Sequence, residues 1–379
     1  MTLGEQFRAV RGPALVLMAT GVYWGALAGL MPDIKAHIGA SDGMMGALLL
    51  FPATASVIAM GIAPGLGARI GGLALPLSGL LISVGLGLFF IMESTTSAAV
   101  ALFLGGFAVA FSDMTANVRI AAHEARRRVH LMNVAHAMYS LSFAITALIV
   151  AALRSGGWAF DWIAFALGGL ALFYVLAGWD GRDPPPADGA QETGGRSAPR
   201  DVVWLAGLVL FASFVCENAA EGWSALYIER TFGAVQGAGS LGPATFGFVM
   251  AGARFFGQAV AGRLGAERLI LSSAALAVVG AAGIAAAQSV LHVHAGVVLM
   301  ALGVAVIAPS TNSIIARKVS DAARARAISR AWMLGLLGFF AGPALMGMFS
   351  EIGDLRISYA AIAVIAAAII PAILRLRHR

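Results

Sequence analysis

The chain has 379 residues, of which 59% are hydrophobic and only 12% are charged, and its formal net charge is +6. A soluble domain carries charge on roughly a quarter of its residues, which keeps its surface hydrated. This composition therefore excludes a soluble protein and indicates that most of the surface lies in a lipid bilayer.

The N-terminal segment has basic residues ahead of an apolar run, an order that is also found in signal peptides. The apolar run continues to about Met31, which is longer than the apolar region of a typical signal peptide. We therefore expect a first membrane helix here, with a cleaved signal peptide as the alternative.

Twelve segments have the length of about twenty apolar residues that a helix needs to cross roughly 30 Å of hydrocarbon. A hydrophilic stretch rich in proline, glycine and charge at 179–201 divides them into two sets of six. The sequence predicts an all-α polytopic membrane protein with a six-helix bundle at 1–178, a linker at 179–201 and a second, pseudo-symmetric six-helix bundle at 202–379. The predicted spans lie near 12–32, 44–66, 73–92, 98–119, 131–153, 159–178, 202–226, 243–263, 268–287, 293–316, 328–349 and 356–376.

Basic residues at the span ends predict the orientation, because cytoplasmic loops carry an excess of lysine and arginine. Most of these residues fall on the side of the termini and the linker, and only Lys35, Arg154, Arg230 and Arg356 fall on the other side. We expect both termini to be cytoplasmic in a bacterial inner membrane. The basic excess is thereby explained without a nucleic-acid partner.

The two halves repeat short motifs in the same order. LGAR at 66–69 closes the second span and LGAER at 264–268 closes the eighth, and aligning the fourth span with the tenth places Asn117 over Asn312. A parallel six-plus-six duplication is the organisation of a two-lobed alternating-access transporter.

Four ionisable residues lie within predicted spans, where such groups are costly and are placed mainly for function. The four that stand out are Asp113, Glu217, Glu221 and Arg254. Three of them have a plainer alternative: Asp113 could pair with Arg119 or another basic group, Arg254 could merely neutralise Glu217, and Glu221 could be solvated near the outer interface.

Further polar residues share helix faces with these groups, because residues three, four or seven apart lie on one side of a helix. Asn117 lies four residues after Asp113, and His136, which could also be a core histidine, lies between Asn133 and Ser140 at this spacing. Aromatic residues of the first and seventh spans could wall a cavity: Tyr23, Trp24, Trp223 and Tyr227.

The chain resembles the major facilitator superfamily in its twelve spans, its central linker and the basic loops after spans two and eight, where APGLGARIGG keeps the glycines and Arg69. Its fourth and fifth spans are similar to the fucose-permease branch, whose carboxylate and Ala-Asn pair match Asp113, Ala116 and Asn117. The branch's fifth helix opens with an Asn and, three residues on, a Gln; Asn133 and His136 hold these places. EGWSALY at 221–227 and GARFFG at 252–257 are similar to that branch too, and the resemblance implies a monomeric carrier.

The resulting prediction is a proton-coupled symporter of a small polar metabolite, sugar-like or other, with Asp113 as the coupling carboxylate. Asn117, Asn133 and His136 would bind the substrate, and Glu217 and Arg254 would form a charge pair in the opposite lobe.

The same residues also bear on three other classes of function: an exporter, a channel and an enzyme. A proton-driven exporter of drugs or metabolites is the alternative, and a channel would not require a duplication. The motifs of intramembrane enzymes, HExxH, GxSxG and paired aspartates at a protease spacing, do not occur, and the single Cys216 excludes a multi-cysteine metal site. We therefore expect neither an enzyme nor a cofactor. Arg254 and Arg119 allow an anionic cargo, whereas the three acids allow a sugar or an amine.

Overall fold

The computed structural model describes residues 8, 10–127, 131–179 and 199–377, so residues 180–198 of the predicted linker lie outside the described residues. Within these ranges every regular element is helical. The first half contains α2 (Arg11–His37), α3 (Asp42–Leu48), α4 (Leu50–Ile70), η1 (Gly71–Leu73), α5 (Ala74–Gly87), η2 (Leu88–Ile91), α6 (Thr95–Arg127), α7 (Met132–Ser155) and α8 (Phe160–Gly178). The second half contains α9 (Arg200–Phe232), η3 (Ala238–Ser240), α10 (Leu241–Leu264), α11 (Ala266–Ala285), α12 (Val290–Val304), α13 (Ile307–Lys318), α14 (Asp321–Ile352), α15 (Leu355–Ala367) and α16 (Ile369–Arg377).

In the described ranges, 11 helical segments are long and apolar enough to cross a membrane, and each covers one of the predicted spans. The remaining predicted span, near 243–263, is occupied by α10, part of whose side chains lie outside the described residues. The prediction of an all-α polytopic membrane protein is therefore confirmed.

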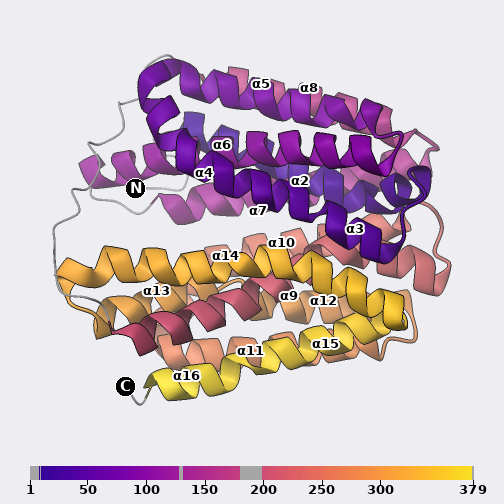
Figure 1. Ribbon diagram of the computed structural model, residues 1–379. Helices are drawn as coiled ribbons and strands as arrows, with labels where there is room; N and C mark the ends of the chain where they lie inside the picture. Colours follow the sequence, from indigo (N-terminus) through magenta and orange to yellow (C-terminus); the bar gives the residue numbers. More distant parts are fainter. Residues whose placement is uncertain (1–7, 9, 128–130, 180–198, 378–379) are drawn as a thin grey trace.

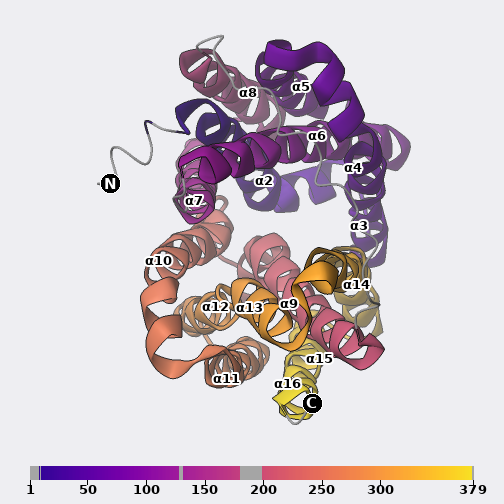
Figure 2. The same cartoon turned by 90° about the vertical axis from the view of Figure 1, so that its left-hand side faces the viewer.

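The helices gather into two groups. In Figure 2, α2 to α8 lie on one side and α9 to α16 on the other. Figure 1 shows the helices lying side by side along a common direction, with both chain termini at the same end. We call this end the terminal end and the other the far end.

Three predicted spans are broken into two helices, and each break precedes a proline. α3 ends at Leu48 before Pro52, α12 ends at Val304 before Pro309, and α15 ends at Ala367 before Pro371. Proline lacks the N–H that would bond the carbonyl four residues back, so the helical ladder is interrupted there.

Glycines let neighbouring helix backbones touch. A Cβ on Gly21 of α2 would lie 2.6 Å from the carbonyl oxygen of Tyr139 on α7, and one on Gly338 of α14 would lie 2.4 Å from that of Phe211 on α9. The two groups meet in the same way at the far end, where a Cβ on Gly347 of α14 would lie 2.5 Å from the Asp42 carbonyl oxygen of α3. Close backbone contact is how membrane helices pack without a hydrophobic drive.

Candidate functional site

A cavity of about 820 Å³ lies between the two helix groups. Its walls come from α2, α4, α6 and α7 on one side and from α9, α10, α13 and α14 on the other. The lining extends to Gly265 and Arg317 at the terminal end, and the side chain of Arg317 is 53% exposed. The four ionisable residues singled out from the sequence all line this cavity: Asp113, Glu217, Glu221 and Arg254.

Asp113 begins a chain of hydrogen bonds on the wall formed by α6 and α7. Asn117 Nδ2 donates to Asp113 Oδ2 over 2.9 Å, and His136 Nε2 lies 3.2 Å from Asn117 Oδ1. The four-residue spacing on α6 places the acid and the amide on one helix face, and the packing of α6 on α7 supplies the histidine. Asp113 and His136 line the cavity, which is large enough for a small molecule, whereas Asn117, which was expected to bind substrate, links them without being a lining residue.

Arg254 connects the two helix groups within the cavity. Its Nη2 donates to Glu217 Oε1 of α9 over 3.1 Å, and its Nη1 donates to Ser140 Oγ of α7 over 2.9 Å. Ser140 itself donates to the His136 carbonyl oxygen one turn earlier on α7. The structure therefore joins Glu217, Arg254 and the stripe that contains His136 into one inter-group network.

Glu221 lies one turn beyond Glu217 on the same face of α9 and also lines the cavity. In the described part of the chain its carboxylate forms no hydrogen bond and no ion pair within 4.0 Å. The sequence allowed a second interpretation, in which Glu221 is merely solvated near the outer interface. Its position in the cavity wall differs from that interpretation.

Two further predicted residues line the cavity. Trp24 contributes to the α2 wall, and Asn312 of α13 accepts a hydrogen bond of 2.8 Å from Trp332 Nε1 of α14. Trp332 was not predicted from the sequence, because it lies twenty residues after Asn312 on the next helix and no spacing rule connects the two positions.

Tyr23 and Trp223 differ from the expectation that they wall the cavity. Both are fully buried, and neither is a lining residue. Tyr23 packs edge-on against Phe89 with ring centroids 6.3 Å apart, and a Cβ on Gly105 would collide with its ring. Both side chains fill the interior of a helix group, since their helices turn these faces away from the cavity. The side chain of Asn133 lies outside the described residues.

Arg119, the alternative partner of Asp113, points elsewhere. Its Nη2 donates to the Gly71 carbonyl oxygen over 2.6 Å, its side chain is buried, and it is not a lining residue. Asp113 therefore does not form the structural pair with Arg119.

At the far end, one arginine binds carboxylates from both helix groups. Arg154 of α7 binds Asp33 of α2 through two hydrogen bonds of 2.6 Å, and it binds Glu229 of α9 at 2.6 and 3.0 Å. The same guanidinium donates to Ser240 Oγ over 3.0 Å. The Arg154 side chain is completely buried, so these bonds replace its hydration.

A second far-end cluster centres on Asp42 of α3. Lys35 of the same half lies 3.2 Å away, while Arg230 of α9 and Ser350 of α14 bind the carboxylate from the other half. Glu351 of α14 accepts from the backbone N–H of Gly43 over 2.8 Å. These two clusters close the end of the cavity opposite to Arg317.

The far-end clusters were not predicted, although the sequence contained a signal for them. Lys35, Arg154 and Arg230 belong to the few basic residues on the side that is depleted of positive charge. A cation that departs from the orientation rule is a candidate for a specific partner.

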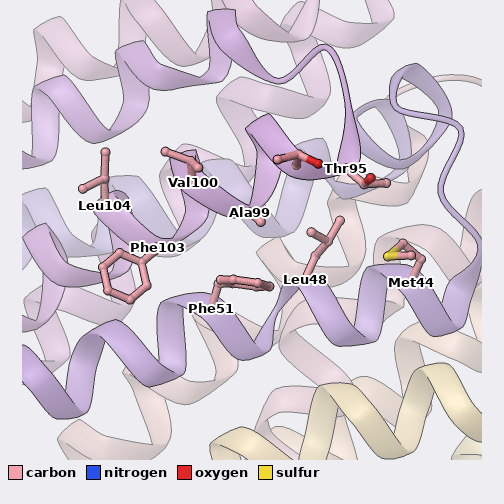
Figure 3. A pocket seen from close by; sticks show the side chains of 9 residues that line it. Met44, Leu48, Phe51, Thr95, Ala99, Val100, Phe103 and Leu104 are labelled. Atoms are coloured by element: carbon pink, nitrogen blue, oxygen red, sulfur yellow. The ribbon is translucent and has the colours of Figure 1, made fainter.

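A second hollow, of about 470 Å³, lies between α3–α4 and α6 (Figure 3). Its lining consists of apolar side chains and two threonines, Thr95 and Thr96. Phe51, Val100 and Leu104 are exposed there, as expected for a surface in hydrocarbon. This hollow offers no ionisable group, so the polar cavity remains the candidate site.

The fold and the cavity define a class: a polytopic membrane carrier whose two helix groups enclose a central polar cavity. The family model described as Major Facilitator Superfamily matches residues 14–298. The chain therefore belongs to the major facilitator superfamily, whose members carry out secondary transport across a membrane and are not enzymes.

Known proteins agree with this assignment. The chain is 24% identical over 353 residues to an uncharacterised MFS-type transporter of Yersinia pestis, which covers 93% of this chain and 91% of that protein. It is 25% identical over 367 residues to an uncharacterised transporter of Sinorhizobium fredii, with coverage of 94% and 95%. The crystal structure of the nucleoside transporter NupG (D323A mutant) superposes with a TM-score of 0.79 at 10% identity, covering 97% of this chain and 99% of that one. At this identity the likeness shows the fold alone.

Proposed function

We propose that this protein imports a small polar metabolite by proton-coupled symport, with Asp113 as the proton-binding carboxylate. The observation that carries the proposal is the hydrogen-bond chain from Asp113 through Asn117 to His136, whose two ends, Asp113 and His136, line the inter-group cavity. A carboxylate between two lobes can meet water from either side in turn, so it can take up a proton on one side and release it on the other.

The two helix groups act in this proposal as the two moving bundles, 1–178 and 202–379, joined by the cytoplasmic linker. The basic excess supports a cytoplasmic terminal end in a bacterial inner membrane. With that orientation the structure is the inward-open state: the cavity reaches the terminal end at Arg317, and the clusters around Arg154 and Asp42 close the outer end. The carrier is expected to function as a monomer.

Substrate would bind between the bundles, where Asp113 and His136 of the first bundle line the cavity together with Glu217, Glu221, Arg254 and Asn312 of the second. Asn117 and Asn133 remain the further predicted ligands of the first bundle, and the side chain of Asn133 lies outside the described residues. Arg254 binds Ser140 of the first bundle and Glu217 of the second. A movement of one bundle relative to the other therefore changes the bonds of a side chain that lines the substrate cavity. Breaking the Ser140 contact is required when the cavity widens at this level. The ionisable and amide side chains among the lining residues favour a hydrophilic cargo over a hydrophobic drug.

The proposal is tested with the purified chain reconstituted into vesicles. Compounds are first selected by thermal stabilisation of the detergent-solubilised protein, because a ligand of the folded state raises its melting temperature. Uptake of the selected compound is then measured with and without an inward proton gradient. We expect gradient-driven uptake to disappear in Asp113→Asn, while substrate-driven exchange without a gradient persists.

Glu93→Gln is the matched control, because Glu93 is 75% exposed at the outer end and pairs only with His37 in the described structure. Gradient-driven uptake by a folded Asp113→Asn protein would refute the coupling role. Accumulation driven by an outward gradient instead would establish the alternative, proton-driven export through the same residues.

A further inference from the structure

The cavity holds an unbalanced set of charges. Its lining contains the carboxylates Asp113, Glu217 and Glu221, against the guanidinium groups of Arg254 and Arg317. Arg317 lies at the mouth and is paired with Glu267 over 2.8 Å. In the deep part of the cavity, three carboxylates therefore face one cation.

That one deep cation is already committed. Arg254 donates to both Glu217 and Ser140, so its charge is already paired within the protein. Arg119, the other arginine that could have received an anion, donates to Gly71 outside the cavity. An anionic cargo would thus meet two carboxylates without a cation to bind it.

Glu221 is the group that lacks a partner. It lines the cavity one turn from the Glu217–Arg254 pair, and it has no hydrogen bond and no ion pair within the described residues. A carboxylate only accepts hydrogen bonds, and a charge held away from bulk water requires an opposite charge or donors. A substrate group that is both a hydrogen-bond donor and positively charged would meet both requirements.

We propose that the substrate carries an ammonium group and that Glu221 is the residue that binds it. The aromatic side chains of Trp24 and Tyr139, which also line the cavity, provide faces against which a cation is attracted. The remainder of the molecule, with hydroxyl or amide groups, then reaches the wall of Asp113, Asn117 and His136. This inference names the substrate class of the proposed carrier and rests on that function.

The test compares amines with their uncharged counterparts. Thermal stabilisation of the purified wild-type protein is measured near neutral pH with methylamine, putrescine and glucosamine, and with methanol, butane-1,4-diol, glucose, N-acetylglucosamine and glucuronate. We expect stabilisation by one or more amines and none by the matched neutral or acidic compounds. The stabilising amine should bind Glu221→Gln about tenfold or more weakly, since truncating one partner of a buried charge pair acts on affinity at this scale.

Glu267→Gln is the matched control, because it removes a carboxylate at the cavity mouth and should leave amine binding unchanged. Glu221→Asp keeps the charge and should retain part of the affinity, which distinguishes lost charge from a fold that fails without glutamate. Stabilisation by glucose or glucuronate equal to that by glucosamine, no effect of any amine, or unchanged amine binding in Glu221→Gln would each overturn the inference.

The outcome is independent of proton coupling. If amines bind through Glu221 but an inward proton gradient still drives their uptake by Asp113→Asn, the coupling proposal fails and the substrate class stands. If coupling through Asp113 holds but the transported compound is neutral and indifferent to Glu221, the reverse is true.

Discussion

In the proposed orientation the far end is the outer end, and its closure can be weakened at a single residue, Glu229. Its two oxygens bind Arg154 at 2.6 and 3.0 Å and also accept from the N–H groups of Gly237 and Gly239 at 3.2 Å. In Glu229→Gln the charge is lost, while Arg154 keeps both bonds to Asp33 within its own bundle. The buried guanidinium therefore stays paired, and the change acts mainly on the contact between bundles.

The size of the effect follows from the burial of the pair. Arg154 is 0% exposed and Glu229 is 15% exposed, and truncating one partner of a buried charge pair costs about 2–5 kcal/mol. Glutamine still accepts one hydrogen bond, so we expect the lower limit, about 2 kcal/mol. That free energy shifts the balance between outer-closed and outer-open states by roughly 30-fold toward the open state.

Spin labels at Ser94 and Gln288 provide the assay, because both residues are exposed at the outer end and belong to different bundles. The native Cys216 is buried and does not compete for the label. We expect a new, longer distance between the labels in Glu229→Gln. Asp161→Asn removes an outer carboxylate that bonds only within its own helix and should leave the distance unchanged. A distance distribution identical to the wild type in Glu229→Gln would refute the reasoning.

Three further substitutions test the packing and the network. Gly347→Val places side-chain atoms against the Asp42 carbonyl oxygen of α3, so we expect the same lengthening of the Ser94–Gln288 distance without any change of charge. Gly21→Val acts within one bundle, against the Tyr139 backbone, and should instead lower the melting temperature by several degrees. Ser140→Ala removes one inter-bundle hydrogen bond of Arg254, worth about 1 kcal/mol, and should change substrate affinity by roughly fivefold while leaving the melting temperature nearly unchanged. A stability loss in Ser140→Ala as large as in Gly21→Val would contradict its assignment to the network between the bundles.

The charges of the far-end clusters are arranged so that the parting of the two bundles expected of the proposed carrier leaves each bundle balanced. When the bundles part, Arg154 retains Asp33 and Asp42 retains Lys35, so each charged group of the first bundle keeps a partner. The departing groups, Glu229 and Arg230, are neighbours in sequence with opposite charge. Neither bundle is left with an unbalanced charge, which keeps the cost of desolvation low in both states.

The sequence by itself determined the membrane class, the spans and the list of polar residues inside them. These properties are local: a span needs about twenty apolar residues, and an ionisable group among them is conspicuous wherever the helix packs. Helical spacing also placed Asn117 on the face of Asp113, where the structure has it bonded at 2.9 Å.

Only the tertiary structure decided which of these residues share a space. Arg154 meets Asp33 across 121 residues of chain and Glu229 across 75, and no periodicity connects such positions. Tyr23 and Trp223 were expected in the cavity but lie in the interior, because a helix that is apolar on all sides gives no indication of which face meets its neighbours. The same holds for Glu221. Only the packing of the bundles shows that Arg254 binds Glu217 and Ser140 and forms no ion pair with Glu221 among the described residues.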